Sequence, residues 1–319
     1  MFWLHILIFI AAVLFLFLSS EWLVKSLTKI ACFLGWREFV LAFFIMAFVG
    51  SLPNLFVGIN SILRGIPELA FGEIVGGNIV DLTIAVALAA IISKNGLTIK
   101  SRTVQGTAIF TLIVAILPLL LIHDRVLSRM DGLILLFTFF AYAFWLFSKG
   151  ERFTRVFEET EKAVGFKDIL KNLGILFSSL ILLLLAAEGM VRSAVFFSDA
   201  LNFPIVLIGI LIVGMGNALP ELFFGIQAAK KGDDWMVLGG LMGAVISASA
   251  LILGIIALLH PIHIGNVDFS LLAVARFFLI VAAVFFLLFI KTGHKITRKE
   301  GIILLIIYLS FVVTQVLVV

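Results

Sequence analysis

Charged residues are scarce in this chain of 319 residues. Asp, Glu, Lys and Arg together make up 13% of it, while hydrophobic residues make up 63%. A soluble domain carries about 25% charged residues, so the composition excludes an ordinary soluble protein and indicates one that crosses a membrane repeatedly. The single cysteine, Cys32, excludes an intrachain disulfide and indicates nothing about the compartment.

Several short motifs are also missing. The chain contains no paired aspartate-rich motifs, no Gly-x-Gly-Asp segment and no His-Glu-x-x-His motif, which are signatures of intramembrane enzymes and metalloproteases. We therefore predict that the protein is not an enzyme. The first apolar segment has no preceding Lys or Arg and no small-residue cleavage motif, so we interpret it as a span and not as a signal peptide.

Long apolar segments fill most of the chain. A helix needs roughly 20 apolar residues to cross a bilayer, and the length of these segments favours helices over short alternating strands. The predicted fold class is an all-α membrane protein with ten transmembrane helices. The expected spans are 3–19, 39–61, 68–92, 103–122, 131–148, 173–190, 204–229, 234–259, 269–290 and 301–318.

Basic residues are unevenly shared between the loops. Eighteen of the 23 Lys and Arg residues fall in one alternate set of loops, and only Arg64, Arg125, Arg129 and Arg192 fall in the other. Short cytoplasmic loops carry such an excess, so we expect a multi-pass protein of the cell membrane with both termini outside. The pI near 9.3 then reflects orientation, and we expect no nucleic-acid partner and no obligate protein partner.

One short sequence segment, here called the phrase, occurs twice. Six of the eight residues from Leu52 to Ile59 are identical to those from Leu219 to Ile226, at an offset of 167. Other matches at this offset divide the chain into a first repeat (1–148), a cytoplasmic linker (149–172) and a second repeat (173–319). Because each half has five expected spans, the second must enter the membrane from the opposite side, an arrangement typical of transporters.

Each copy of the phrase contains a proline in the middle of an expected span. Proline removes a backbone donor and crowds the carbonyl four residues before it, which frees the carbonyls near Val49 and Gly216. Only the second copy keeps an acid, Glu221, where the first has Asn54. Carboxylates, amides and free carbonyls are ligands for a hard cation, and an ionisable residue in mid-membrane indicates function.

The span after the first copy supplies two more acids. Glu73 and Asp81 are eight residues apart, on one helical stripe, and Asn78 lies close to it. The corresponding part of the second half, 239–248, contains no carboxylate. The two halves are therefore expected to contribute different acids to one site at their interface.

These motifs resemble those of the cation/calcium antiporter superfamily, which includes the sodium/calcium exchangers. Its inverted repeats usually carry G-T-S-L-P-E, followed by G-x-x-x-G-S-N-x-x-[N/D], and both blocks are recognisable here. The resemblance implies secondary active antiport by alternating access, in which Ca²⁺ and Na⁺ bind alternately, with no cofactor besides the transported ions. The candidate cation ligands are Ser51, Asn54, Glu73, Asn78, Asp81, Asn217 and Glu221, together with the carbonyls of Val49 and Gly216.

The chain also departs from the family pattern. Asn54 replaces a Glu, Ala218 replaces a Ser, and Ala248 stands where an Asn or Asp is usual. These losses remove Na⁺ ligands, so H⁺ is an alternative coupling ion to Na⁺. Glu73 has two interpretations, either a cation ligand or a carboxylate at the pore mouth or a helix cap. The alternative function is a degenerate family member with a structural or sensing role and no transport.

Overall fold

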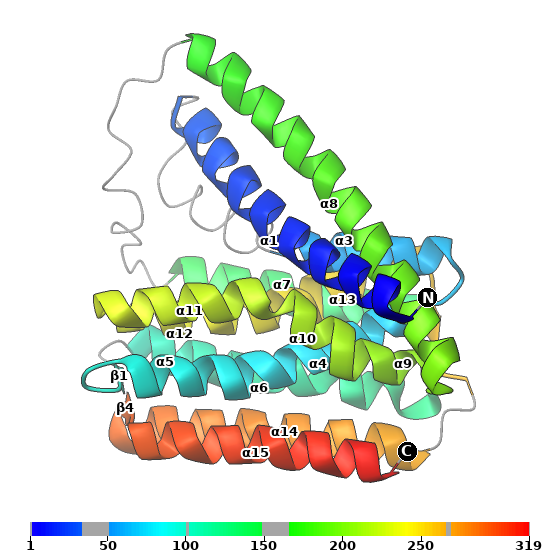
Figure 1. Ribbon diagram of the computed structural model, residues 1–319. Coiled ribbons are helices and arrows are strands. Elements are labelled where there is room, and N and C mark those ends of the chain that lie inside the picture. The colour runs from blue at the N-terminus through cyan, green and yellow to red at the C-terminus, as the bar shows by residue number, and fades with distance from the viewer. Residues whose placement is uncertain (1, 34–50, 100–101, 149–165, 266–268, 319) are drawn as a thin grey trace.

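The computed structural model describes residues 2–33, 51–99, 102–148, 166–265 and 269–318, and it is almost wholly helical (Figure 1). The helices of the first half are α1 (Phe2–Phe33), α3 (Leu52–Leu63), α4 (Glu68–Val80), η2 (Asp81–Ala85), α5 (Val86–Ile92), α6 (Arg102–Leu121), η3 (Ile122–Asp124) and α7 (Arg129–Ser148). Those of the second half are α8 (Phe166–Leu201), α9 (Ile205–Ile208), η4 (Gly209–Val213), α10 (Gly214–Asn217), α11 (Leu219–Lys231), α12 (Asp234–Ile246), η5 (Ser247–Ile252), α13 (Leu253–Leu259), α14 (Phe269–Gly293) and α15 (Arg298–Val318).

Nine helical segments in the described residues are long and apolar enough to cross a membrane, and the shorter α3 is apolar too. Three of the nine are composite, because π-helical turns (η2, η4 and η5) interrupt α-helices that otherwise run on. The all-helical fold is as predicted. Residues 39–50, the start of the expected second span, lie outside the described residues, so the count of ten stays a prediction.

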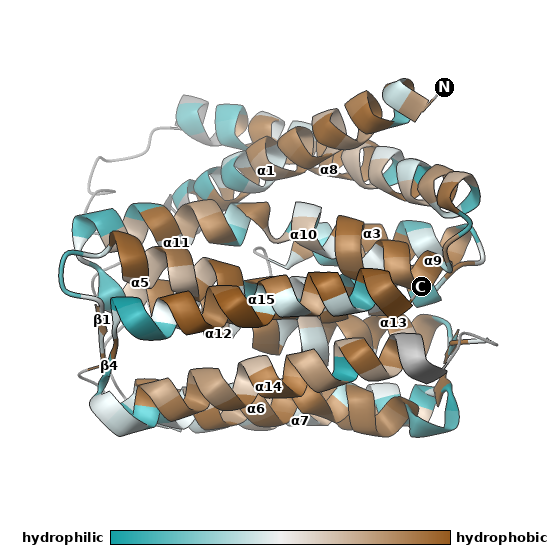
Figure 2. Cartoon of the chain, turned by 60° about the horizontal axis from the view of Figure 1, so that its bottom comes forward, coloured by the Kyte–Doolittle hydropathy of each residue, from teal (hydrophilic) through white to brown (hydrophobic). Residues whose placement is uncertain are grey.

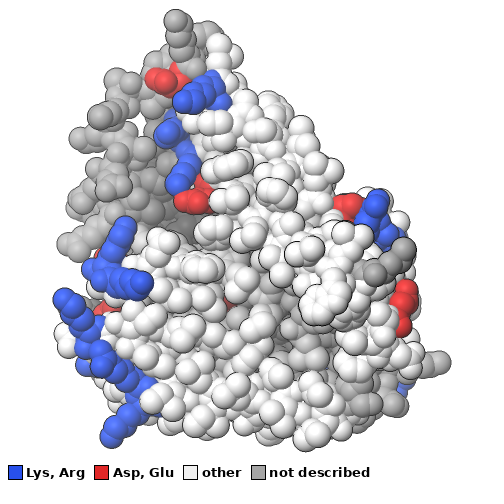
Figure 3. Space-filling model, in the orientation of Figure 1, with Lys and Arg blue, Asp and Glu red and all other residues white. Residues whose placement is uncertain are grey.

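Polar and apolar residues are distributed as in a membrane protein. Hydrophobic residues cover the helices along most of their length, and hydrophilic residues gather at their ends (Figure 2). Charged side chains lie mainly toward the ends of the helices and leave a broad, nearly uncharged belt between them (Figure 3). With nine apolar helices of spanning length in the described residues, the chain is an integral multi-pass membrane protein.

Two helices extend well beyond their expected spans. The helix α1 continues to Phe33, past the expected end at residue 19, and α8 begins at Phe166, inside the expected linker. A helix of 36 residues is about 54 Å long and exceeds a hydrocarbon core of about 30 Å. Charged residues in these extensions are compatible with helix, which is why hydropathy alone ends the spans too early. The two helices pack side by side and lean away from the others (Figure 1).

Two short antiparallel strand pairs join loops of the two halves. Strand β1 (Leu97–Thr98) pairs with β4 (Lys295–Ile296), and β2 (Val126–Leu127) pairs with β3 (Ile262–His263). Each pair connects loops that the charge pattern assigns to the same side of the membrane. Both described ends of the chain lie at the same end of the bundle, opposite β1 and β4 (Figure 1).

Glycines bring the helices of the two halves into close contact. A Cβ added to Gly76 in α4 would lie 2.0 Å from the carbonyl oxygen of Ile210 in η4, and one added to Gly72 would lie 2.2 Å from that of Val206. Small residues at such spacing let helix backbones approach closely within a membrane. This contact holds α4 against η4 and α10, and it positions the cavity described next.

Candidate cation-binding site

A small cavity lies where α3, α4, α10, α11 and α12 meet. Seven of the nine predicted ligands line it. The predicted ligands in its wall are Ser51, Asn54, Glu73, Asn78, Asp81, Asn217 and Glu221, and the other lining residues are Ile74, Gly77, Gly214, Ala218, Ala244 and Ala248.

Val49 and Gly216 were predicted to offer backbone carbonyls to the cation, and the structure describes only the second of them. Val49 lies outside the described residues. Gly216 is buried in α10 and does not line the cavity, because its Cα faces Phe9 and Val13 of α1 and Met190 of α8. Its neighbour Gly214 lines the cavity instead.

Both repeated prolines begin a helix. Pro53 and Pro220 occupy the first turns of α3 and α11, where a backbone N–H has no partner within the helix. In the second copy, α10 ends at Asn217 and α11 begins at Leu219, and Ala218 joins them with a φ of −82° and a ψ of −3°. The proline therefore divides this segment as predicted, and it places Asn217 and Glu221 on either side of the division.

Buried acceptor atoms without a partner gather around the cavity. Glu73 and Asp81 are 1% and 5% exposed, and Glu221 is partly buried. Within the described chain, Glu73 Oε2, Asp81 Oδ1, Asn217 Oδ1 and Glu221 Oε2 are inaccessible and accept no hydrogen bond. Such atoms are costly to bury unpaired, and a cation bound in the cavity would give a partner to those that it contacts.

One amide connects the two halves across the cavity. Asn217 Nδ2 donates to Asn54 Oδ1 at 2.9 Å and also to Glu73 Oε1. Nδ2 is thus the end of the Asn217 amide that faces Asn54 and Glu73. Asn217 Oδ1 is thereby the end left unpartnered. Glu73 itself is 1% exposed and lines the cavity.

The acids alone do not form a compact metal cluster. In the described ranges, no three His, Cys, Asp or Glu side chains lie close enough to hold one ion among themselves. Ca²⁺ takes about 6–8 oxygen ligands at about 2.3–2.6 Å. A cation in this cavity would therefore need amide, hydroxyl or carbonyl oxygens beside the carboxylates, and the lining residues include all these types.

One polar residue near the site escaped prediction. Asn78 Nδ2 donates to Ser249 Oγ at 2.6 Å, and both side chains are buried. At an offset of 167, Asn78 aligns with Val245, and Ser249 aligns with Leu82. The repeat therefore did not indicate Ser249 as a partner of Asn78. Ser249 lies one helical turn beyond Val245, the residue that aligns with Asn78.

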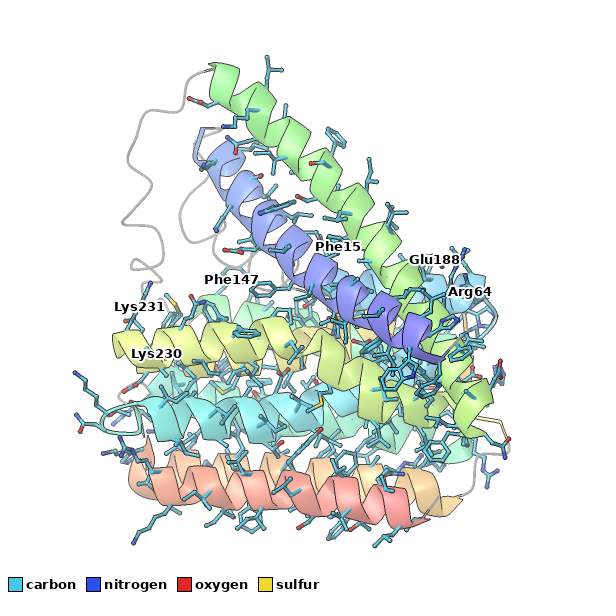
Figure 4. The ribbon with its side chains drawn as sticks, viewed as in Figure 1. Phe15, Arg64, Phe147, Glu188, Lys230 and Lys231 are labelled. Carbon is cyan, nitrogen blue, oxygen red and sulfur yellow. The ribbon has the colours of Figure 1, made fainter. Side chains whose placement is uncertain are left out.

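Two acids outside the cavity form ion pairs. Glu21 pairs with Lys25 at 2.5 Å, and Glu188 pairs with Arg192 at 2.6 Å. Glu188 also accepts from Arg64, at the end of α3 (Figure 4), and this hydrogen bond raises the pKa of the Arg64 guanidinium. The α1 and α8 pair is thus tied to the helix that carries Asn54.

Comparisons with known proteins identify the family. The family model described as sodium/calcium exchanger protein matches residues 4–148 and again 171–317. The sodium/calcium exchanger MaX1 of Methanosarcina acetivorans is 26% identical, over 97% of both chains. The inner membrane protein YrbG of Escherichia coli is 24% identical, over 92% of this chain and 91% of its own. A structure of the sodium-calcium exchanger NCX_Mj, soaked with Na⁺ and Sr²⁺, superposes with a TM-score of 0.66 at 26% identity, covering 98% of this chain and 99% of its own.

Proposed function

This chain belongs to the sodium/calcium exchanger protein family, and we propose that it exchanges Ca²⁺, or a related divalent cation, for Na⁺ or H⁺. Cation antiport itself follows from the family and from relatives that match this chain over nearly its whole length. The family is one of exchangers, which are transporters. The choice of ions and the alternating-access mechanism are our proposal.

The cavity with its unpartnered oxygens is the observation that carries this proposal. Glu73 and Asp81 come from the first half, while Glu221 and Asn217 come from the second. Their buried acceptors have no hydrogen-bond partner among the described residues, and a divalent cation supplies the charge that they lack. The remaining predicted ligands would complete its oxygen shell.

Alternating access would come from the two halves moving against each other. We propose that they are inverted repeats, as the odd number of expected spans requires. The twofold match of the family model supports two related halves, and the glycine contact between α4 and η4 supports a site at their interface. A cation bound between carboxylates of both halves would be released when that interface rearranges.

The proposed orientation has both termini outside and the 149–172 linker in the cytoplasm. Lys230 and Lys231 lie at the opposite end of the bundle from Arg64 (Figure 4), which agrees with the charge pattern. After replacement of Cys32 by Ser, single cysteines in place of Lys230 and of Arg125 can be labelled in intact cells. An impermeant reagent that labelled only the cysteine at 230 would overturn the orientation.

Transport into proteoliposomes tests the function directly. Purified protein is reconstituted, and uptake of Ca²⁺, Mg²⁺ and Mn²⁺ is measured with an imposed Na⁺ gradient, an imposed H⁺ gradient or neither. We expect uptake of at least one divalent cation that depends on one of the gradients and is absent in Glu221→Gln. Binding of Ca²⁺ without uptake under any gradient would instead favour the structural or sensing alternative.

A further inference from the structure

Ser249 holds the side chain of Asn78 from outside the cavity. Asn78 lines the cavity, whereas Ser249 does not. The hydrogen bond from Asn78 Nδ2 to Ser249 Oγ is 2.6 Å long, and the two residues are 2% and 0% exposed. Asn78 belongs to α4 and Ser249 to η5, so the contact again joins the two halves of the chain.

The orientation of an amide decides whether it attracts or repels a cation. Its oxygen is an acceptor and a possible ligand, whereas its nitrogen carries two donor hydrogens. Because Nδ2 of Asn78 is held by Ser249, Oδ1 is the end of this cavity-lining amide that Ser249 does not engage. Asn217 follows the same arrangement, because its Nδ2 is held by Asn54 and Glu73 while its Oδ1 has no partner in the described chain.

We propose that Ser249 is a positioning residue of the cation site, which keeps the carbonyl oxygen of Asn78 directed at the bound ion. This inference rests on the proposed function, since it assumes that the cavity binds a cation. Ser249 does not touch the ion and acts only through Asn78. A residue that orients a metal ligand in this way commonly changes metal affinity by about 10- to 100-fold when it is replaced.

Ca²⁺ binding to variants of the detergent-purified protein, measured by calorimetry, tests the proposal. Ser249→Ala removes the hydroxyl, and we expect Ca²⁺ affinity to fall by about 10- to 100-fold. Ser249→Thr keeps a hydroxyl and should retain most of the affinity. Ser247→Ala is the matched control, because Ser247 is a buried serine of the same π-helical segment that does not line the cavity.

The same substitution made in an Asn78→Asp variant separates a positioning role from general damage to the fold. A carboxylate presents oxygen at both ends, so an Asp at position 78 needs no orienting partner. Ser249→Ala should therefore have little effect on Ca²⁺ affinity when it is added to Asn78→Asp. The comparison is made between variants that have the same melting temperature without Ca²⁺. A purely structural role of Ser249 would lower Ca²⁺ affinity in both backgrounds and would not produce this difference.

The outcomes distinguish this inference from the proposed function. Equal losses of affinity from Ser249→Ala in both backgrounds, or equal losses from Ser249→Ala and Ser247→Ala, would overturn the positioning role. Wild-type affinity in Ser249→Ala would overturn it as well. If the unmodified protein binds no divalent cation, the proposed function fails and the inference fails with it. If Ser249→Ala does not fold, a loss in Ser249→Thr as large as in Glu221→Gln would overturn the positioning role, because the hydroxyl is still present in that variant.

Discussion

Replacement of Glu73 by Gln separates two roles that the structure allows for this residue, cation ligand and anchor of Asn217. The substitution removes one negative charge from the cavity, yet the side chain keeps its size and a carbonyl oxygen that can still accept from Asn217. The packing of α4 and the bridge to the second half should therefore survive. If Glu73 is a cation ligand, the loss will be in cation binding. If it only anchors Asn217, binding will change little.

The burial of Glu73 sets the size of the expected effect. The residue is 1% exposed, and its Oε2 accepts no hydrogen bond from the described residues. Removal of one partner from a buried charge pair costs about 3–5 kcal/mol. At about 1.4 kcal/mol for each factor of ten, Ca²⁺ should bind Glu73→Gln about 100- to 4,000-fold more weakly. Stability without Ca²⁺ should stay the same or rise, because one buried charge is gone.

Titration calorimetry with Ca²⁺, paired with thermal unfolding in its absence, measures both quantities. Glu68→Gln is the matched control, since Glu68 begins the same helix, is half-buried and does not line the cavity. Its Ca²⁺ affinity should equal that of the unmodified protein. Unchanged affinity in Glu73→Gln would refute the assignment of Glu73 as a ligand, and an equal loss in both variants would refute the role of the cavity.

Three further predictions follow from the same contacts. Glu221→Gln should abolish Ca²⁺ binding and leave the protein folded in the membrane, and calorimetry that shows unchanged binding would remove Glu221 from the site. Gly76→Ala should destabilise the protein by about 1–3 kcal/mol or more, because its Cβ would overlap backbone. The control is Gly225→Ala, whose Cβ would have its nearest contact at 3.9 Å, and it should have the melting temperature of the unmodified protein. Equal melting temperatures of the two variants would contradict this prediction. Arg64→Ala should cost at most about 1 kcal/mol, because the ion pair with Glu188 is partly exposed, and a larger loss that persists in high salt would point to another role.

Much of the site followed from residue types at helical spacing. Glu73 and Asp81 were placed on one stripe of a helix, and both line the cavity. The prediction succeeded because an α-helix brings residues four apart onto one face. Asp81 nevertheless begins a π-helical turn, and no spacing in the sequence indicated that turn. The stripe survives because the turn widens only after Asp81.

The details that failed depend on contacts between distant segments. Gly216 was expected to offer a free carbonyl to the ion, but the residue does not line the cavity, and a Cβ at its position would point at α1 and α8. The direction of a backbone group depends on which helices pack around it, and hydropathy does not determine that. Ser249 and the bond between Arg64 and Glu188 were missed for the same reason, because their partners lie more than a hundred residues away.

The lengths of α1 and α8 illustrate a second limit. Apolar content marks only the part of a helix that lies in hydrocarbon, whereas helical hydrogen bonding continues into water wherever side chains permit it. The pair of helices packs around a separate set of buried residues, which includes Leu16 and Met190. Mutual packing of this kind stabilises helical turns that composition assigns to loops.

The charge of the cavity determines which ion can accompany a divalent cation. Three carboxylates line it, so one Ca²⁺ leaves a negative charge, and a buried carboxylate without a counter-charge costs several kcal/mol. A proton needs a single carboxylate oxygen, whereas Na⁺ needs a shell of oxygens, and Ser51 is the only hydroxyl residue lining the cavity in the described chain. We therefore expect Ca²⁺ uptake to follow an imposed H⁺ gradient more strongly than a Na⁺ gradient.

Asn54→Glu combined with Ala218→Ser tests this argument about coupling. A Glu at position 54 can still accept the hydrogen bond from Asn217, so the bridge between the halves should persist, while the cavity gains a carboxylate and a hydroxyl. The double variant should show a larger dependence on the Na⁺ gradient than the unmodified protein in proteoliposomes. Ala244→Gly, which alters the cavity wall without adding an oxygen, is the control and should not shift the dependence toward Na⁺. Steep Na⁺-driven Ca²⁺ uptake by the unmodified protein, with no response to a proton gradient, would refute this account of the substitutions.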